Sequence, residues 1–164
     1  MKNLYFIGGP MGVGKTEVSQ KLKKLLAACV MLDGDWCWDA DPFTVTDETK
    51  AMVTDNICHM LNNFIRCSAY GNIVFCWVMH DKSIIDGLLS RLDLRDVRVI
   101  SLSLTATPYT LESRLRLDVD RGIREEDAIP RSLARLPLYA ALNTVKLDTT
   151  DKTPDDIAKE IARL

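Results

Sequence analysis

The sequence lacks a hydrophobic run long enough to cross a membrane. Its longest uncharged apolar stretch, Ile73–Met79, has seven residues, whereas a spanning helix needs about 20. The first residues carry a single Lys and soon become glycine-rich, without a small-residue cleavage site, so they are unlike a signal peptide. These absences predict a cytoplasmic protein with no membrane partner.

Metal-binding cysteine pairs and an excess of positive charge are also missing. The cysteines are odd in number, mostly lie in apolar runs and form no CxxC pair: Cys29, Cys37, Cys58, Cys67 and Cys76. This pattern argues against a structural zinc site or a disulfide framework and favours buried, reduced thiols. The net charge of −2 argues against a general nucleic-acid binder.

No linker rich in proline, glycine or serine divides the chain. Its 164 residues are close to the commonest size of one domain. The apolar fraction of 47% and the charged fraction of 27% are ordinary for a globular protein. We therefore expect a single domain over residues 1–164.

Short apolar segments alternate with helical patterns along the chain. The expected strands are Leu4–Ile7, Cys29–Leu32, Ile73–Val78, Val97–Leu104 and Thr144–Leu147. Several are apolar throughout, as strands covered on both faces must be. Thr107-Pro108 and Thr153-Pro154 are typical helix starts. The order βαβαβαβαβα predicts a three-layer α/β fold with a parallel sheet between helices.

The strongest motif follows the first expected strand. Residues Gly9–Thr16 match GxxxxGK[ST], with a strand before and an amphipathic helix after. Glycines let backbone N–H groups surround a phosphate, and the helix directs its positive end at the same anion. Lys15 can reach the β- and γ-phosphates and Thr16 can hold Mg²⁺. We expect an ATP site formed by Gly9, Met11, Gly12, Val13, Gly14, Lys15 and Thr16.

This loop and the order of elements resemble the P-loop small-molecule kinases of the shikimate kinase, gluconate kinase and chloramphenicol phosphotransferase type, within the P-loop NTPase superfamily. The resemblance covers the whole chain in element order, but only the phosphate loop is a specific motif. It implies a five-stranded parallel sheet of order 2-3-1-4-5 and a short lid at roughly residues 118–136.

An acidic turn, Asp33-Gly34-Asp35, follows the second expected strand. Ligands of open parallel sheets bind outside the carboxyl ends of the strands. The resemblance implies that Asp33 supports Mg²⁺ through water and that Asp35 faces the acceptor hydroxyl as base or orienter. The alternative is that these acids only form turns and helix caps, a role that suits Asp39 and Asp41 better.

The charge of this region bears on the acceptor. Residues 25–49 contain six acids and no Lys or Arg. A phosphorylated or carboxylated acceptor would need arginine forks, so the pattern favours a neutral or cationic hydroxyl compound. Trp36, Trp38 and Phe43 can stack on it, attract a cation or simply be core residues. Cations from elsewhere can still enter the pocket, namely Arg66, Lys82, Arg131 or Arg135.

Arginine replaces lysine in the second half of the chain, with six arginines between residues 114 and 135 and no Lys from 83 to 145. The resemblance to a kinase lid implies that Arg114 stacks near adenine and that Arg121 and Arg124 clamp the transferring phosphate. The alternative is a surface ladder with neighbouring acids. The loop after the fifth strand, with Thr150, either touches the adenine edge or is a plain connection.

Two further residues follow the third expected strand. Asp81 can cap the helix beginning at Lys82, and His80 can line the acceptor site or be structural. Together the patterns favour an ATP- and Mg²⁺-dependent kinase acting on a hydroxyl of a small molecule. The alternatives are a nucleoside or nucleotide kinase and an NTP-binding regulatory ATPase without acceptor. The patterns leave open the acceptor's identity and whether the protein is a monomer or a dimer.

Overall fold

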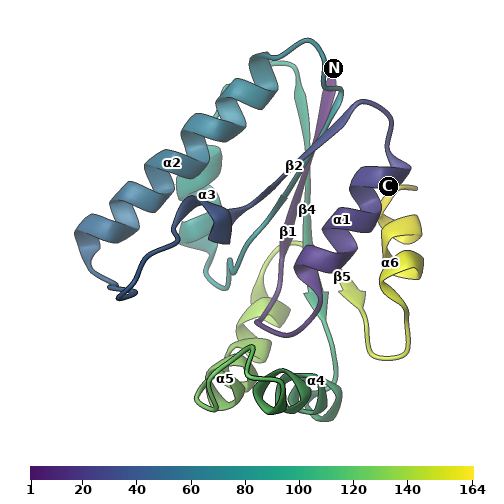
Figure 1. Cartoon of the computed structure of the whole chain (residues 1–164). Coiled ribbons are helices and arrows are strands. Elements are labelled where there is room, and N and C mark those ends of the chain that lie inside the picture. Colours follow the sequence, from purple (N-terminus) through teal and green to yellow (C-terminus); the bar gives the residue numbers. More distant parts are fainter.

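The computed structural model, which describes all 164 residues, contains five strands and six α-helices (Figure 1). In chain order the elements are β1 (Lys2–Gly8), α1 (Lys15–Leu25), β2 (Cys29–Asp33), the 3₁₀ turn η1 (Gly34–Cys37), α2 (Asp47–Arg66), β3 (Asn72–Cys76), α3 (Lys82–Leu89), β4 (Val97–Thr105), α4 (Pro108–Asp120), α5 (Ala128–Ala141), β5 (Val145–Asp148) and α6 (Pro154–Ile161). No helix among them is both long and apolar enough to span a bilayer.

The strands form one parallel sheet in the order β2-β3-β1-β4-β5, so the expected topology is confirmed. The central strand β1 shows why both faces are covered. Its Leu4 and Phe6 pack in a core with α2 and α3, whereas Tyr5 and Ile7 pack in a second core with α1 and α6. Side chains alternate across a strand, so an apolar strand serves two cores at once.

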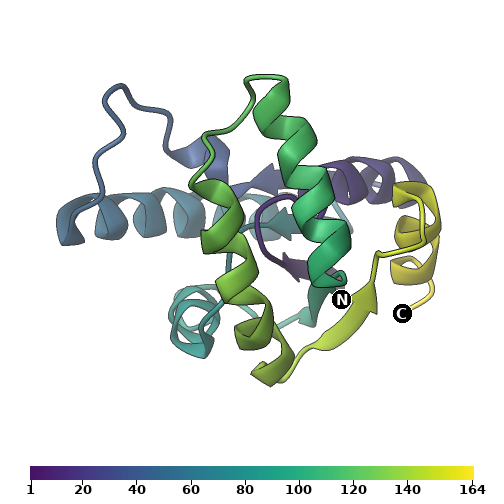
Figure 2. The same cartoon turned by 90° about the horizontal axis from the view of Figure 1, so that it is seen from below.

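Helices α4 and α5 lie below the carboxyl ends of the strands, and they cross in front of those ends when the molecule is seen from below (Figures 1 and 2). One helix was expected between β4 and β5, and the structure has two. Gly122, with φ of 69°, ends α4, as the sequence indicated. Helix α5 begins six residues later, and the segment 118–136 spans the end of α4, the turn 121–127 and the start of α5.

The prolines of α5 explain why the sequence pattern did not predict this helix. Pro130 lies in the first turn, where its missing N–H has no intrahelical partner to lose. Pro137 lies inside the helix. It is tolerated there because packing of buried residues, including Ile129 and Tyr139, holds the helix in place.

Candidate active site

The phosphate loop, residues 9–16, joins the end of β1 to the start of α1. Gly9 and Gly12 are required there, because their φ angles are positive and a Cβ at either position would clash with a neighbour. A Cβ on Gly9 would lie 2.9 Å from the carbonyl oxygen of Leu104, and one on Gly12 would lie 2.6 Å from Cδ2 of Leu115. Only glycine permits this path of the backbone against β4 and α4.

Helix α5 holds two carbonyl groups of the loop. The Tyr139 hydroxyl donates to the carbonyl oxygen of Gly9 at 2.9 Å, and the Ser132 hydroxyl donates to that of Met11 at 2.6 Å. Both side chains are buried. The loop is therefore fixed from its outer side before any anion binds.

Arg114 of α4 provides a third connection. Its guanidinium donates to the carbonyl oxygen of Val13 at 3.5 Å, and to the hydroxyl and carbonyl oxygens of Thr149 at 2.9 and 2.7 Å. Arg114 thus joins the phosphate loop to the loop after β5. Its predicted contact with adenine stays a prediction.

Lys15 lies half-buried at the start of α1, and its Nζ donates to the carbonyl oxygen of Pro10 at 2.9 Å. Loss of solvent around the ammonium lowers the pKa of Lys15 to about 8. The charges of Asp35 and Asp33 offset this loss only in part. A bound phosphate would add negative charge beside the ammonium, so the electrostatics favour an anionic ligand.

Thr16 and Asp33 meet behind the loop. The Thr16 hydroxyl donates to Oδ2 of Asp33 at 2.6 Å, and the buried Asp33 also accepts the N–H of Asp35 at 3.1 Å. A hydroxyl that donates its proton to a carboxylate keeps its lone pairs free for a cation. No group of three or more His, Cys, Asp and Glu side chains could hold a metal alone, but Mg²⁺ uses one or two protein oxygens together with water and phosphates. The pair therefore fits Mg²⁺ bound with a nucleotide.

Asp35 is held by a tryptophan from the neighbouring strand end. Trp77 Nε1 donates to Oδ1 of Asp35 at 3.1 Å, and the Trp77 ring lies against Gly34, where a Cβ would approach it to 2.5 Å. Partial burial and the nearby charge of Asp33 raise the pKa of the Asp35 carboxyl. The result is a positioned carboxylate of increased basicity.

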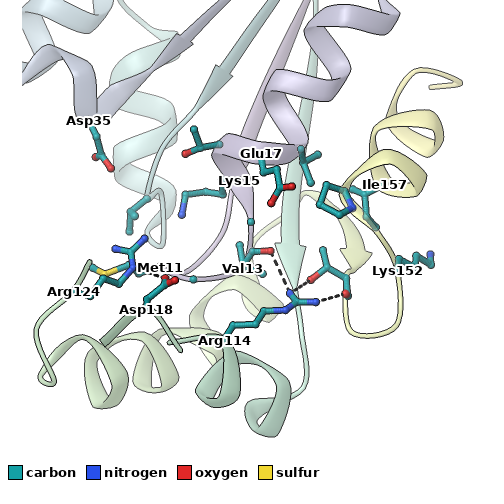
Figure 3. A pocket seen from close by; sticks show the side chains of 17 residues that line it. Met11, Val13, Lys15, Glu17, Asp35, Arg114, Asp118, Arg124, Lys152 and Ile157 are labelled. Carbon is teal, nitrogen blue, oxygen red and sulfur yellow. Dashed lines mark hydrogen bonds and ion pairs between the residues drawn. The ribbon is translucent and has the colours of Figure 1, made fainter. Parts of the chain in front are cut away.

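These groups share one cavity of about 570 Å³ (Figure 3). Its lining comes from the phosphate loop, α1, η1, the segment after β3, α4, the turn after α4, the loop after β5 and α6: Met11, Gly12, Val13, Gly14, Lys15, Thr16, Glu17, Val18, Asp35, Val78, Arg114, Asp118, Arg124, Thr149, Lys152, Pro154 and Ile157. Asp35 and Arg124 lie on the same side of Lys15 in Figure 3, and Nε of Arg124 donates to Oδ2 of Asp118 at 3.0 Å. Most of the predicted site residues are thus brought together.

Four predicted residues do not line this cavity. Gly9 and Asp33 are buried next to lining residues, Gly9 in the phosphate loop and Asp33 through its bond to Thr16. Arg121 is exposed at the end of α4, and Thr150 bonds to the backbone N–H of Thr107 and to Asp148 instead. The predicted roles of Arg121, which was to clamp the transferring phosphate, and of Thr150, which was to touch the adenine edge, stay predictions. From the loop after β5 it is Thr149 that lines the cavity.

The surroundings of Asp81 and His80, the two candidate residues after β3, favour structural roles. Asp81 caps α3, and its carboxylate accepts the N–H of Ser83 at 2.7 Å, as one alternative predicted. His80 has a buried Nδ1 with no hydrogen-bond partner. Burial, and then the charge of Arg135, lower the pKa of His80 and so favour its neutral form.

Comparisons with known proteins give matches over nearly the whole chain. A curated protein of Pyrococcus furiosus, which carries the provisional name adenylate kinase, is 27% identical over 96% of this chain and 81% of its own length. Among solved structures, the tunicamycin resistance protein of Deinococcus radiodurans superposes with a TM-score of 0.77 at 21% identity, covering 99% of this chain and 95% of that one.

Two solved kinases share the same architecture. The gluconokinase of Sinorhizobium meliloti has a TM-score of 0.71 at 16% identity, over 98% of this chain and 90% of that one. The shikimate kinase of Acinetobacter baumannii, solved with shikimate, has a TM-score of 0.64 at 21% identity, over 99% and 92%. A family model described as an AAA domain matches residues 6–130, which include the end of β1, the phosphate loop and the strands β2, β3 and β4. With that match over most of its length, the chain belongs to this AAA-domain family of P-loop proteins.

Proposed function

We propose that the protein is a kinase that transfers the γ-phosphate of ATP to a hydroxyl group of a small molecule. The observation that carries this proposal is the position of Asp35. Its carboxylate is fixed by Trp77 and lines the same cavity as the phosphate loop, Lys15 and Arg124. A module that only binds and slowly hydrolyses a nucleotide has no need of a second, separately positioned carboxylate there.

In this proposal the phosphate loop and Lys15 hold the β- and γ-phosphates, while Arg114 and the loop containing Thr149 and Thr150 lie toward the base. Mg²⁺, when bound with ATP beside Thr16 and Asp33, neutralises part of the phosphate charge. Arg124 faces the transferring group. Arg121 would join it only after the turn 121–127 moves inward.

Asp35 acts on the acceptor. Its carboxylate takes the proton of the acceptor hydroxyl as that oxygen bonds to the γ-phosphorus. The bond from that phosphorus to the oxygen bridging the β- and γ-phosphates breaks, and ADP leaves with the electron pair. The raised pKa of Asp35 suits this role, because the group is a stronger base than an exposed carboxylate.

A nucleotide kinase is the second candidate, and the provisional name of the Pyrococcus furiosus relative favours it. Such an acceptor brings its own phosphate, which arginine forks would bind. Residues 25–49, which lead into and out of the Asp35 turn, contain no Lys or Arg. This supports the small-molecule acceptor over a nucleoside monophosphate.

The experiment follows transfer of labelled γ-phosphate from ATP·Mg²⁺ to a panel of sugars, amino alcohols, nucleosides and nucleoside monophosphates. We expect acceptor-dependent product with the native chain and none with Lys15→Ala. Asp35→Asn should reduce transfer by about 10²- to 10⁴-fold, the range typical of a general base, with ADP affinity nearly unchanged. Transfer confined to nucleoside monophosphates would favour the second candidate, and acceptor-independent hydrolysis would favour a regulatory ATPase.

A further inference from the structure

Asp118 places a carboxylate in a cavity whose proposed ligand is a polyphosphate. The residue lies in the last turn of α4, where its charge opposes the helix dipole, and it lines the cavity together with Lys15 and Arg124. A negative charge is unfavourable by itself both at the end of a helix and beside bound phosphates. The side chain must then serve another purpose, which its contact with Arg124 indicates.

The guanidinium of Arg124 uses only one edge in this contact. Its Nε donates to Oδ2 of Asp118 at 3.0 Å, and Nη1 and Nη2 have no hydrogen-bond partner in the structure. A guanidinium carries its donors in a fixed plane, and its two terminal nitrogens form a fork that can bind two phosphate oxygens at once. The bond at Nε thus fixes the plane and leaves the terminal fork free.

The free end of Arg124 faces the centre of the cavity. In Figure 3 it points toward the space between Lys15 and Asp35, with Asp118 on the other side of the guanidinium. Burial is the main cause of the lowered pKa of Lys15, and the charge of Arg124 contributes to it. Arg124 also opposes the rise that burial causes in the pKa of Asp35. The fork therefore adjoins both ends of the proposed phosphoryl transfer.

The turn between α4 and α5 brings Arg124 back to Asp118. The N–H of Gly122 donates to the carbonyl oxygen of Val119 at 2.9 Å. The N–H of Ile123 donates to that of Asp118, also at 2.9 Å. These two bonds, around a glycine with φ of 69°, form a Schellman motif. The chain thus reverses over the last turn of α4, and the next residue, Arg124, reaches the carboxylate six positions before it.

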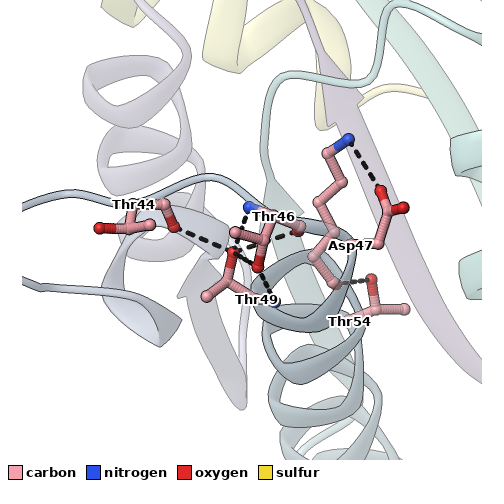
Figure 4. A network of polar contacts seen from close by, with 6 residues as sticks. Thr44, Thr46, Asp47, Thr49 and Thr54 are labelled. Atoms are coloured by element: carbon pink, nitrogen blue, oxygen red, sulfur yellow. Dashed lines mark hydrogen bonds and ion pairs between the residues drawn. The ribbon is translucent and has the colours of Figure 1, made fainter.

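The Asp118–Arg124 pair differs from the surface pairs of the chain. Arg116 of α4 bonds to an acid one helical turn away, and the pair of Asp47 with Lys50 on α2 is largely in solvent (Figure 4). Exposed pairs of this kind contribute little. The Asp118 and Arg124 side chains are 28% and 33% exposed, which makes theirs the least exposed ion pair of the chain. Arg124 is also the only residue of the turn 121–127 that is not exposed.

We propose that Asp118 is a positioning residue, which holds Nε of Arg124 so that the terminal nitrogens of this arginine bind the transferring phosphoryl group. This inference rests on the proposed kinase function and adds a residue to it. The Nε bond persists when the nucleotide binds, because the carboxylate and the phosphoryl group occupy different edges of one guanidinium. An arginine that is already oriented needs little rearrangement when charge develops in the transition state.

The experiment uses aluminium fluoride, which binds beside ADP and Mg²⁺ in place of the transferring phosphoryl group and needs no identified acceptor. Calorimetric titration gives the ADP dissociation constant with and without fluoride, and the native chain should bind ADP more tightly with it. Asp118→Ala should reduce this tightening by about tenfold, since a hydrogen bond between charged groups is lost. ADP affinity without fluoride should stay nearly unchanged. A carboxylate that only added negative charge would have the opposite effect, because its removal would strengthen binding of the fluoride.

Asp120→Asn is the matched control. Asp120 lies in the same helical turn, is exposed and does not line the cavity, so the variant removes the same charge without touching Arg124. It should leave both dissociation constants unchanged. Asp118→Asn keeps an oxygen that can accept from Nε, and it should restore most of the tightening that Asp118→Ala loses. Asp118→Ala combined with Arg124→Ala should lose no more than Arg124→Ala alone, because Asp118 acts through that arginine.

Several outcomes overturn this inference. They are a tightening by fluoride that is equal or stronger in Asp118→Ala, losses that add in the double variant, and no tightening in the native chain, where an oriented fork should bind the fluoride. Alanine favours helix, so Asp118→Ala should fold. A failure of the kinase function is seen separately, as γ-phosphate transfer that Lys15→Ala does not reduce, whereas the fluoride titration requires no transfer.

Discussion

The hydroxyl of Tyr139 bonds to the carbonyl oxygen of Gly9, 130 residues earlier in the chain, at 2.9 Å. This contact joins α5 to the phosphate loop from its outer side, and Ser132 adds a second bond, to Met11. Because α5 also follows the turn that carries Arg124, the loop and that turn are connected through one helix. The position of the phosphate-binding backbone thus depends on a distant aromatic side chain.

Removal of this hydroxyl tests the connection. Tyr139→Phe keeps the buried ring but leaves the Gly9 carbonyl without its donor, which we expect to lower the free energy of unfolding by about 1–3 kcal/mol. ADP affinity should fall by roughly threefold to tenfold, because the loop relaxes. Urea unfolding and calorimetric titration measure the two effects. Tyr109→Phe is the control, and equal ADP affinity in both variants would show that the loop holds its shape without Tyr139.

Two glycines give opposite predictions for the same substitution. Gly12→Ala places a Cβ 2.6 Å from Leu115 at a positive φ, and we expect it to destabilise the fold by about 1–3 kcal/mol and to abolish nucleotide binding. Gly87 lies inside α3 with open space around its Cα. Gly87→Ala should stabilise the protein by about 0.5–1 kcal/mol, because alanine loses less backbone freedom in a helix. Thermal unfolding distinguishes the two, and destabilisation by Gly87→Ala would contradict this account.

The sheet could be predicted because its signals are local. The centre of β1, Leu4–Ile7, is apolar throughout, and Thr107-Pro108 and Thr153-Pro154 mark the starts of α4 and α6. Helix α5 could not be predicted in this way, since Pro130 and Pro137 break its local pattern. Its helical conformation depends on packing beneath the strand ends.

The same distinction between local sequence signals and contacts between distant residues applies to the site. The phosphate loop and the Asp33–Asp35 turn are continuous in sequence and carry their own pattern. Trp77, Ser132 and Tyr139 reach them across 42 to 130 residues, and no spacing rule connects such positions. For Trp77 a partial signal existed, because the sheet order places the ends of β2 and β3 side by side, but the indole-to-carboxylate bond required the structure.

The arginines near the turn 121–127 can now be distinguished. Arg124 lines the cavity and pairs with Asp118, whereas Arg121 is exposed and outside it. Arg124→Lys keeps the charge but loses the planar fork, so kcat should fall by about tenfold or more while KM for ATP changes little. Arg121→Lys is the matched control and should have a smaller effect. Steady-state kinetics with an accepted substrate give the answer, and a larger effect at Arg121 would mean that the turn closes over the nucleotide.

The ammonium of Lys15 predicts a pH dependence of nucleotide binding. Burial lowers its pKa to about 8 in the nucleotide-free protein, and bound phosphates raise it again by favouring the charged form. Near pH 7.5 the group is mostly protonated, so binding takes up less than one proton. Near pH 9.5 it is mostly neutral, so ADP binding must take up close to one proton and its affinity falls, by at most tenfold per pH unit above 8. Titration of the ADP phosphates contributes little to proton uptake in this pH range, because a secondary phosphate pKa lies near 6.

Calorimetric titration in two buffers of different ionisation enthalpy measures this proton uptake directly. Lys15→Arg is the control, because a guanidinium stays charged throughout the range and should flatten the profile even if it binds ADP more weakly. Proton uptake that rises with pH in the native chain and is absent in the variant would assign the titration to Lys15. An ADP affinity that is the same at both pH values in the native chain would show that the loop binds phosphate through its backbone N–H groups alone, with the lysine charge contributing little.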